Sequence, residues 1–161
     1  MLKVNSPVGN IFFDKEFEDL QRENFERLRI SRMELEKRIL RRKTDRGTDV
    51  GWNLTPGVKL RHGDLFKNEG KKIVLDQIPE KVISIKIKPN TPPTFMVLLG
   101  HVIGNRHRPV SVQSDEILFP IQADSELEIF TKLFDGILGQ IDMTIKEQVF
   151  FPTSGTDFHE H

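Results

Sequence analysis

Hydrophobic and polar positions in the second half of the chain alternate with two different periods. Residues 82–88 read Val-Ile-Ser-Ile-Lys-Ile-Lys, which is the alternation of a half-buried strand. Later, apolar residues at the spacing of one helix face indicate an amphipathic helix: Leu127, Phe130, Leu133 and Phe134. The elements predicted in chain order are a strand at 82–88, a helix from Asn90 or Thr91 to about His101, strands at 109–112 and 116–121, a helix capped by Asp124 or Ser125, and a strand at 141–149.

In the first half, pattern and propensity disagree. Residues 14–43 are rich in Glu, Lys, Arg and Leu, which favour helix by propensity alone. Between Leu28 and Ile39, however, the apolar positions alternate with a one-residue shift, which favours a strand with a bulge. Strands at 50–54 and 58–60 flank the turn Thr55-Pro56-Gly57. Short strands joined by turns are therefore predicted for this half.

A change of composition at residues 76–81 separates the two halves. We therefore predict a β-rich N-terminal domain at 1–76, a second domain at 77–150 and a flexible C-terminal tail at 151–161. The second domain has the element order βαββαβ of the ferredoxin-like fold. The fold class is accordingly α+β.

Composition narrows the function classes. Lys+Arg and Asp+Glu both total 24, so nucleic acid and anionic membranes are poor partners by net charge. The apolar stretches are too short to span a bilayer and the amino terminus lacks a signal-peptide pattern, so we expect a cytoplasmic protein. The chain has no cysteine, which removes thiolate metal chemistry and thiol catalysis.

Histidine is the remaining residue type that could bind a transition metal strongly. Five are present, namely His62, His101, His107, His159 and His161. His107 lies in the turn Gly104-Asn105-Arg106-His107-Arg108-Pro109, in which Gly104 and Asn105 could end the preceding helix in a left-handed conformation. His101 is six positions upstream of His107, so the two would not share a helix face.

These histidines also have simpler interpretations. A single turn histidine could be structural, packing is favoured over ligation for His101, and His62 is expected to be solvated in a turn between strands. The tail pair His159-Glu160-His161 could be idle or could close over a half-filled metal site. One imidazole alone is a weak site, but a symmetric dimer would bring two copies of His107 together.

Three segments carry a family resemblance. They are residues 44–51 (Thr-Asp-Arg-Gly-Thr-Asp-Val-Gly), residues 60–65 (Leu-Arg-His-Gly-Asp-Leu) and the Gly104–Pro109 turn. Together they resemble the UreE family of urease accessory proteins, the nickel metallochaperones, over about residues 29–151. Many members of that family have long histidine-rich tails, whereas this chain ends in a short His-Glu-His.

The resemblance implies a nonenzymatic chaperone that binds Ni(II) and delivers it for insertion into the urease active site during urease maturation. It implies a homodimer with the equivalent of His107 binding nickel at its centre, and such dimers could pair further around the ion. His159, His161 and, more weakly, His101 are the accessory ligand candidates. Zn(II) or Cu(II) could also bind in vitro, because imidazole suits all three metals. The implied partners are the accessory GTPase UreG and the urease maturation complex, with the first domain as the protein-binding module.

Two alternative functions compete with the nickel carrier. A metal-dependent hydrolase would need a clustered His/Asp/Glu motif that the sequence does not show. A ferredoxin-like protein- or RNA-binding module without a metal-carrier role is the other, although the aromatic ribonucleoprotein signature is missing from the predicted strands. The basic run at residues 37–43 is interpreted as a solvated strand edge or as a docking surface for a protein.

Overall fold

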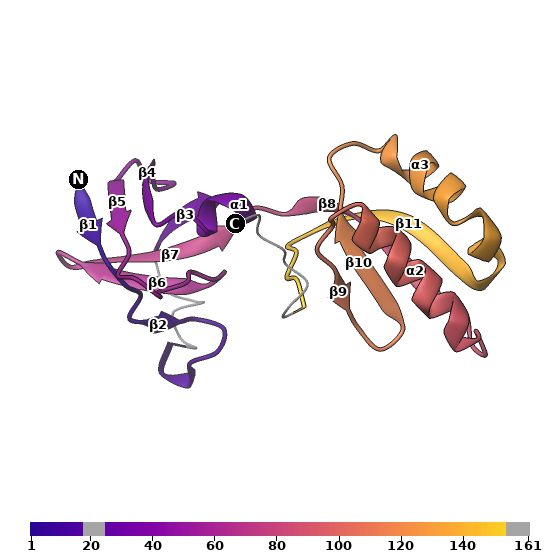
Figure 1. Cartoon of the computed structure of the whole chain (residues 1–161). Coiled ribbons are helices and arrows are strands. Elements are labelled where there is room, and N and C mark those ends of the chain that lie inside the picture. The colour runs from indigo at the N-terminus through magenta and orange to yellow at the C-terminus, as the bar shows by residue number, and fades with distance from the viewer. Residues whose placement is uncertain (18–24, 154–161) are drawn as a thin grey trace. The chain divides into compact units, whose positions relative to one another are not determined.

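The computed structural model describes residues 1–17 and 25–153, which form a mixed α+β, strand-rich protein (Figure 1). The predicted α+β class is confirmed at this level. Contacts divide the chain into two units, the first spanning Met1–Ile78 and the second beginning at Pro79. None of the helices in the described ranges is long and apolar enough to cross a membrane.

The described residues of the first unit, 1–17 and 25–78, form two sheets. The three-stranded sheet has the order β1-β5-β4 and the four-stranded sheet the order β2-β6-β7-β3. Their bounds are β1 Leu2–Val4, β5 Asp49–Asn53 and β4 Ile39–Lys43, then β2 Gly9–Asn10, β6 Asp64–Asn68, β7 Lys71–Gln77 and β3 Glu26–Ile30. The pairs β1/β5 and β3/β7 are parallel. Trp52, 2% exposed, lies in the core of this unit, and its indole N–H donates to the Lys37 carbonyl at 2.8 Å.

The predicted bulged strand between Leu28 and Ile39 is wrong. Strand β3 ends at Ile30, and the short helix α1 (Arg32–Leu35) follows before β4 begins. Ser31 caps α1 by accepting a hydrogen bond from the Glu34 backbone N–H at 3.2 Å, while the Glu34 carboxylate accepts one from the Ser31 N–H at 3.1 Å. This reciprocal capping box satisfies two backbone donors of the first turn, which makes even one helical turn favourable here.

The other predictions for this half had mixed outcomes. Strand β5 confirms the prediction at 50–54 to within a residue, but residues 58–60 form no strand. Strands β6 and β7 were not predicted. The basic run lies on β4, an edge strand of its sheet, where Arg41 pairs with Asp49 and Arg42 with Glu34. The interpretation as a solvated strand edge is consistent with these exposed pairs.

The second unit has the element order β8, α2, β9, β10, α3, β11. These are β8 Glu80–Ile87, α2 Pro93–Asn105, β9 Ser111–Val112, β10 Glu116–Pro120, α3 Glu126–Leu133 and β11 Ile141–Gln148, with the 3₁₀ helix η2 (Asp135–Gln140) before β11. The antiparallel sheet has the order β11-β8-β10-β9. Ile83 and Ile85 of β8 point to the same face and pack in one core with Leu99 of α2 and Phe130 of α3. Both helices therefore cover that face.

Both predicted boundaries of helix α2 are wrong, whereas the predicted start of helix α3 is confirmed. Helix α2 starts after Pro92, without a side-chain cap, and continues to Asn105 rather than ending near His101. Helix α3 starts after Ser125, but neither predicted cap supplies a side-chain hydrogen bond to it. Instead the Glu126 carboxylate accepts hydrogen bonds from the backbone N–H groups of Gln122 and Ala123. Both donors precede the helix, so the Glu126 carboxylate fixes the loop before α3 to the first helical residue and does not cap the helix.

Candidate functional site

His107 lies in the turn that ends α2. Arg106 is the C-cap residue, and His107 follows with a φ of +52°. Its backbone N–H donates to the Gly104 carbonyl at 3.0 Å, and its side chain is exposed. The prediction that Gly104 or Asn105 would adopt the left-handed conformation is wrong, because both belong to α2 and the left-handed residue is His107 itself.

The left-handed backbone of His107 is unfavourable for its residue type. Glycine is the usual residue at this position after a helix, and a non-glycine residue there costs about 1–2 kcal/mol. A strained backbone of this kind at an exposed residue is a reason to suspect a function. The geometry ends the helix and presents the imidazole to solvent.

Arg108 attaches this turn to the rest of the second unit. Its guanidinium donates to the Pro120 carbonyl at 3.1 Å and forms an ion pair with Glu126. Burial would raise the pKa of Glu126, but hydrogen bonds from two backbone N–H groups and the Arg108 charge outweigh it and lower the pKa. Arg108 therefore has a structural role, because these contacts fix the turn to the end of β10 and the start of α3.

The structure places only one of the other three candidate ligands, which are His101, His159 and His161. His101 is exposed on α2, with its Nε2 atom 3.1 Å from the side-chain amide nitrogen of Asn105. His159 and His161 lie outside the described residues. Within residues 1–17 and 25–153, no group of three or more His, Cys, Asp or Glu side chains could hold a metal ion.

The chain is similar in sequence to proteins of one known family. Residues 13–75 match the family model described as the N-terminal domain of the UreE urease accessory protein. A protein of Flavobacterium johnsoniae is 34% identical over 124 residues, covering 74% of this chain and 69% of the relative. One of Staphylococcus saprophyticus is 33% identical over 133 residues, covering 80% and 82%. Both carry the name urease accessory protein UreE.

The chain belongs to the UreE family of urease accessory proteins. A third relative, from Lysinibacillus sphaericus, is 34% identical over 125 residues, covering 75% of this chain and 77% of the relative, and it has the same name. Membership confirms the resemblance drawn from the sequence. UreE proteins are accessory proteins of urease rather than enzymes, so the predicted nonenzymatic class is also confirmed.

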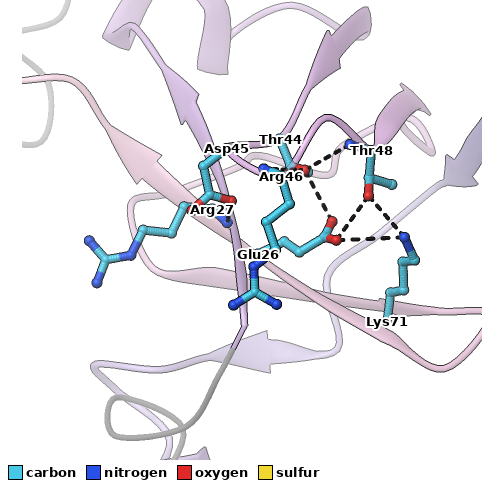
Figure 2. Close-up of polar contacts among 7 residues, drawn as sticks. All are labelled: Glu26, Arg27, Thr44, Asp45, Arg46, Thr48 and Lys71. Atoms are coloured by element: carbon cyan, nitrogen blue, oxygen red, sulfur yellow. Dashed lines mark hydrogen bonds and ion pairs between the residues drawn. The ribbon is translucent and has the colours of Figure 1, made fainter.

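The part of the chain that matches the UreE N-terminal domain contains an unpredicted buried network (Figure 2). The carboxylate of Glu26, a residue only 7% exposed, accepts hydrogen bonds from the Thr48 hydroxyl at 2.9 Å and the Thr44 hydroxyl at 3.1 Å. Lys71 lies 3.6 Å from the same carboxylate and donates to the Thr48 hydroxyl at 2.9 Å. Burial would raise the pKa of Glu26, but these hydrogen bonds and the Lys71 charge outweigh it and lower the pKa.

The turn between β4 and β5, which contains Thr44 and Thr48, also forms hydrogen bonds with β3. The Asp45 N–H donates to the Arg27 carbonyl at 2.9 Å, and the Asp45 carboxylate accepts from the Arg27 N–H at 2.9 Å. Gly47 has a φ of +83°, which glycine adopts at little cost. Residues 44–49, which lie within the segment that resembles the UreE family, therefore close the β4–β5 hairpin and attach it to β3.

His62 is not the solvated turn residue that was predicted. It is half-buried, its ring stacks on Phe12 with centroids 4.9 Å apart, and its Nδ1 atom accepts a hydrogen bond from the Gln77 N–H at 2.9 Å. Burial lowers the pKa of His62, partly offset by Asp76. The folded first unit therefore favours the neutral imidazole, which alone can accept at Nδ1.

We expect the first unit to lose stability as the pH falls through the range in which His62 would protonate when unfolded, below about pH 6.5. The sign follows because the folded pKa is lowered, so the unfolded chain binds more protons in that range. Urea unfolding followed by fluorescence of Trp52, the single tryptophan, measures this unit. His62→Asn keeps an acceptor and removes the titration, and should flatten the pH dependence. An equal slope in both proteins would contradict the assignment.

The neutral charge of the whole chain conceals an opposite imbalance in its two parts. Residues 1–78 contain 17 Lys and Arg against 13 Asp and Glu, an excess of four positive charges. Residues 79–161 contain 7 against 11, an excess of four negative charges. A net negative charge raises the local concentration of metal cations around the part of the chain that carries His107.

Proposed function

We propose that this UreE-family protein is a urease accessory nickel metallochaperone, which binds Ni(II) and delivers it for insertion into the urease active site. The observation that carries the proposal is the exposed His107 imidazole at a left-handed turn of a family member. Nickel is the cargo of this protein. A carrier must release its ion, and a site with few protein ligands and open coordination positions allows transfer to a recipient with better ligands.

The ligand set proposed here uses two copies of the chain. One imidazole is a weak ligand set, and a twofold dimer is the commonest way to bring two identical side chains together. His107 from each copy would form the centre, with His159 and His161 of the tail as further ligands and His101 as a weaker candidate. Such dimers could pair further around the ion. Zn(II) and Cu(II) would compete in vitro, since affinity at imidazole sites follows copper above nickel.

We also propose that the second unit is a ferredoxin-like domain. The support is its element order βαββαβ, its antiparallel sheet β11-β8-β10-β9 and its two helices on one face. This arrangement places the His107 turn at the end of the first helix, just before the edge strand β9. The site would then be carried by a rigid packed domain, which holds a ligand side chain better than a free loop does.

For the first unit we propose a role in binding proteins of urease maturation, with the accessory GTPase UreG as the recipient of nickel in the cytoplasm. The support is its match to the UreE N-terminal domain together with its excess of positive charge, which favours an acidic partner. Both units have separate cores, so each role can be tested without unfolding the other.

Nickel titration by calorimetry, with the oligomeric state followed by light scattering, tests the carrier proposal. We expect tight binding at one ion per dimer, because each copy contributes one His107 imidazole to a shared centre. Replacing both tail histidines, in the variant His159→Ala/His161→Ala, should weaken binding without abolishing it. Nickel binding no stronger than that of a generic surface histidine would show that this chain has kept the fold of the family without the carrier function.

A further inference from the structure

The segment after β11 crosses the face of the second-unit sheet that the helices leave open. Phe150, 1% exposed, packs with Val82 of β8 and Leu118 of β10. Val82 and Leu118 alternate with Ile83 and Phe119, which face the helices, so this small cluster lies on the opposite face. We call residues 150–153 the strap.

The strap ends by pairing with the outer edge of β9. The Thr153 N–H donates to the Val110 carbonyl at 2.8 Å, and the Thr153 hydroxyl accepts from the Val112 N–H at 2.8 Å. Residues of β9 that bond to β10 alternate with Val110 and Val112, so these two present their backbone groups outward. Strand β11 is at one edge of the sheet and β9 at the other, so the strap carries the chain from one edge to the other.

This path brings the start of the tail to the His107 turn. Val110 follows His107 by three residues, a separation of at most about 11 Å between Cα atoms. Thr153 is paired to Val110, which adds about 5 Å. His159 follows Thr153 by six residues, which can span at most about 20 Å. The reach of the tail thus exceeds the largest possible gap of about 16 Å, within a single copy of the chain.

We propose that the strap is a positioning device for the metal site, with Phe150 and Thr153 fixing the start of the C-terminal tail beside the His107 turn. The inference rests on the proposed nickel-carrier function and adds how the tail ligands find the ion. Without the strap, the tail would start at Gln148, at the opposite edge of the sheet and with eleven residues before His159. Anchoring at Thr153 shortens this connection and raises the effective concentration of the tail imidazoles at His107.

The test is a cycle of variants in the full-length chain, measured by nickel calorimetry. Phe150→Ala/Thr153→Val releases the strap, and Thr153→Ser keeps the hydroxyl as a matched control. Release should weaken nickel binding about two- to fivefold, because effective concentration falls with roughly the 3/2 power of the connecting length. In the His159→Ala/His161→Ala background the same release should change nothing, since the strap would act only through the tail.

A second variant keeps the proposal testable if strap release unfolds the domain. Twelve Gly and Ser residues inserted between Ser154 and Gly155 leave the strap intact and extend the connection from six residues to eighteen, which should weaken nickel binding about fivefold. Equal losses with and without the tail histidines would assign the strap a purely structural role and overturn the proposal. Unchanged affinity in all strap and insertion variants would overturn it as well. If His107→Ala leaves nickel binding unchanged, the carrier function itself fails, which is a distinct result.

Discussion

Replacing His107 should lower the affinity for nickel at least about 100-fold, since loss of even an outer-shell partner of a metal ligand costs 10- to 100-fold and a shared site would lose two direct ligands. His107 is exposed, so the fold should be retained. Three variants separate the imidazole from the backbone conformation. His107→Ala removes the ring, His107→Asn keeps a polar side chain that tolerates the left-handed region, and His107→Gly removes the conformational penalty.

All three variants should lose nickel, but their stabilities should differ. His107→Gly should be the most stable, with a gain of up to about 1 kcal/mol, because its φ of +52° no longer opposes a Cβ atom. Thermal unfolding followed by circular dichroism measures that order, and calorimetry measures nickel. Retained nickel affinity in His107→Asn and His107→Ala together would remove His107 from the site. A lower stability of His107→Gly than of the unsubstituted protein would contradict the inference that the backbone of His107 is strained.

Replacing Glu26 should destabilise the first unit and leave nickel binding unchanged. In Glu26→Ala, the hydroxyls of Thr44 and Thr48 lose their acceptor and Lys71 loses its counter-charge, which we expect to cost about 2–3 kcal/mol. Glu26→Gln is the matched control, since it keeps an acceptor of the same size without the charge and should cost about 1 kcal/mol. Trp52 fluorescence in urea measures both values.

Nickel calorimetry on the same two variants tests whether nickel binding depends on the second unit alone. The core that contains Trp52 shares no residue with the core under α2 and α3, so loss of Glu26 should not reach His107. Weakened nickel binding in Glu26→Ala would show that the first unit takes part in the metal site. An unfolding curve identical to that of the unsubstituted protein would contradict the inferred role of the network in holding the β4–β5 hairpin.

The local pattern of apolar residues predicted the order of elements in the second unit but not in the first. Strand β8 and the burial of Phe130 in α3 follow directly from the period of apolar residues, whereas Leu133 of the same predicted face is exposed. In the first unit, Ser31 and Glu34 carried a capping-box signal that the alternation around them obscured, so a helical turn was predicted as a bulge. The parallel pairs β1/β5 and β3/β7 join residues far apart in sequence, and such pairings leave no local periodic signal.

The candidate site also depends on geometry that local sequence patterns do not reveal. The turn motif pointed to His107, but only the backbone geometry shows that His107, rather than Gly104 or Asn105, adopts the left-handed conformation. The burial of His62 has no local signal, because its partners Phe12 and Gln77 are distant in sequence. The Glu26 network and the strap depend likewise on contacts between separate elements, which composition and spacing do not encode.

The opposite charge of the two halves also affects how the protein behaves at high concentration. A chain with a pI near 7.0 has almost no net charge at neutral pH, so copies do not repel one another as a whole. The basic part of one copy can instead attract the acidic part of another, which favours reversible clustering and turbidity in dilute buffer. Physiological salt, with a screening length of about 8 Å, should suppress this attraction. Purification and storage of this protein would then depend on ionic strength more than a neutral composition suggests.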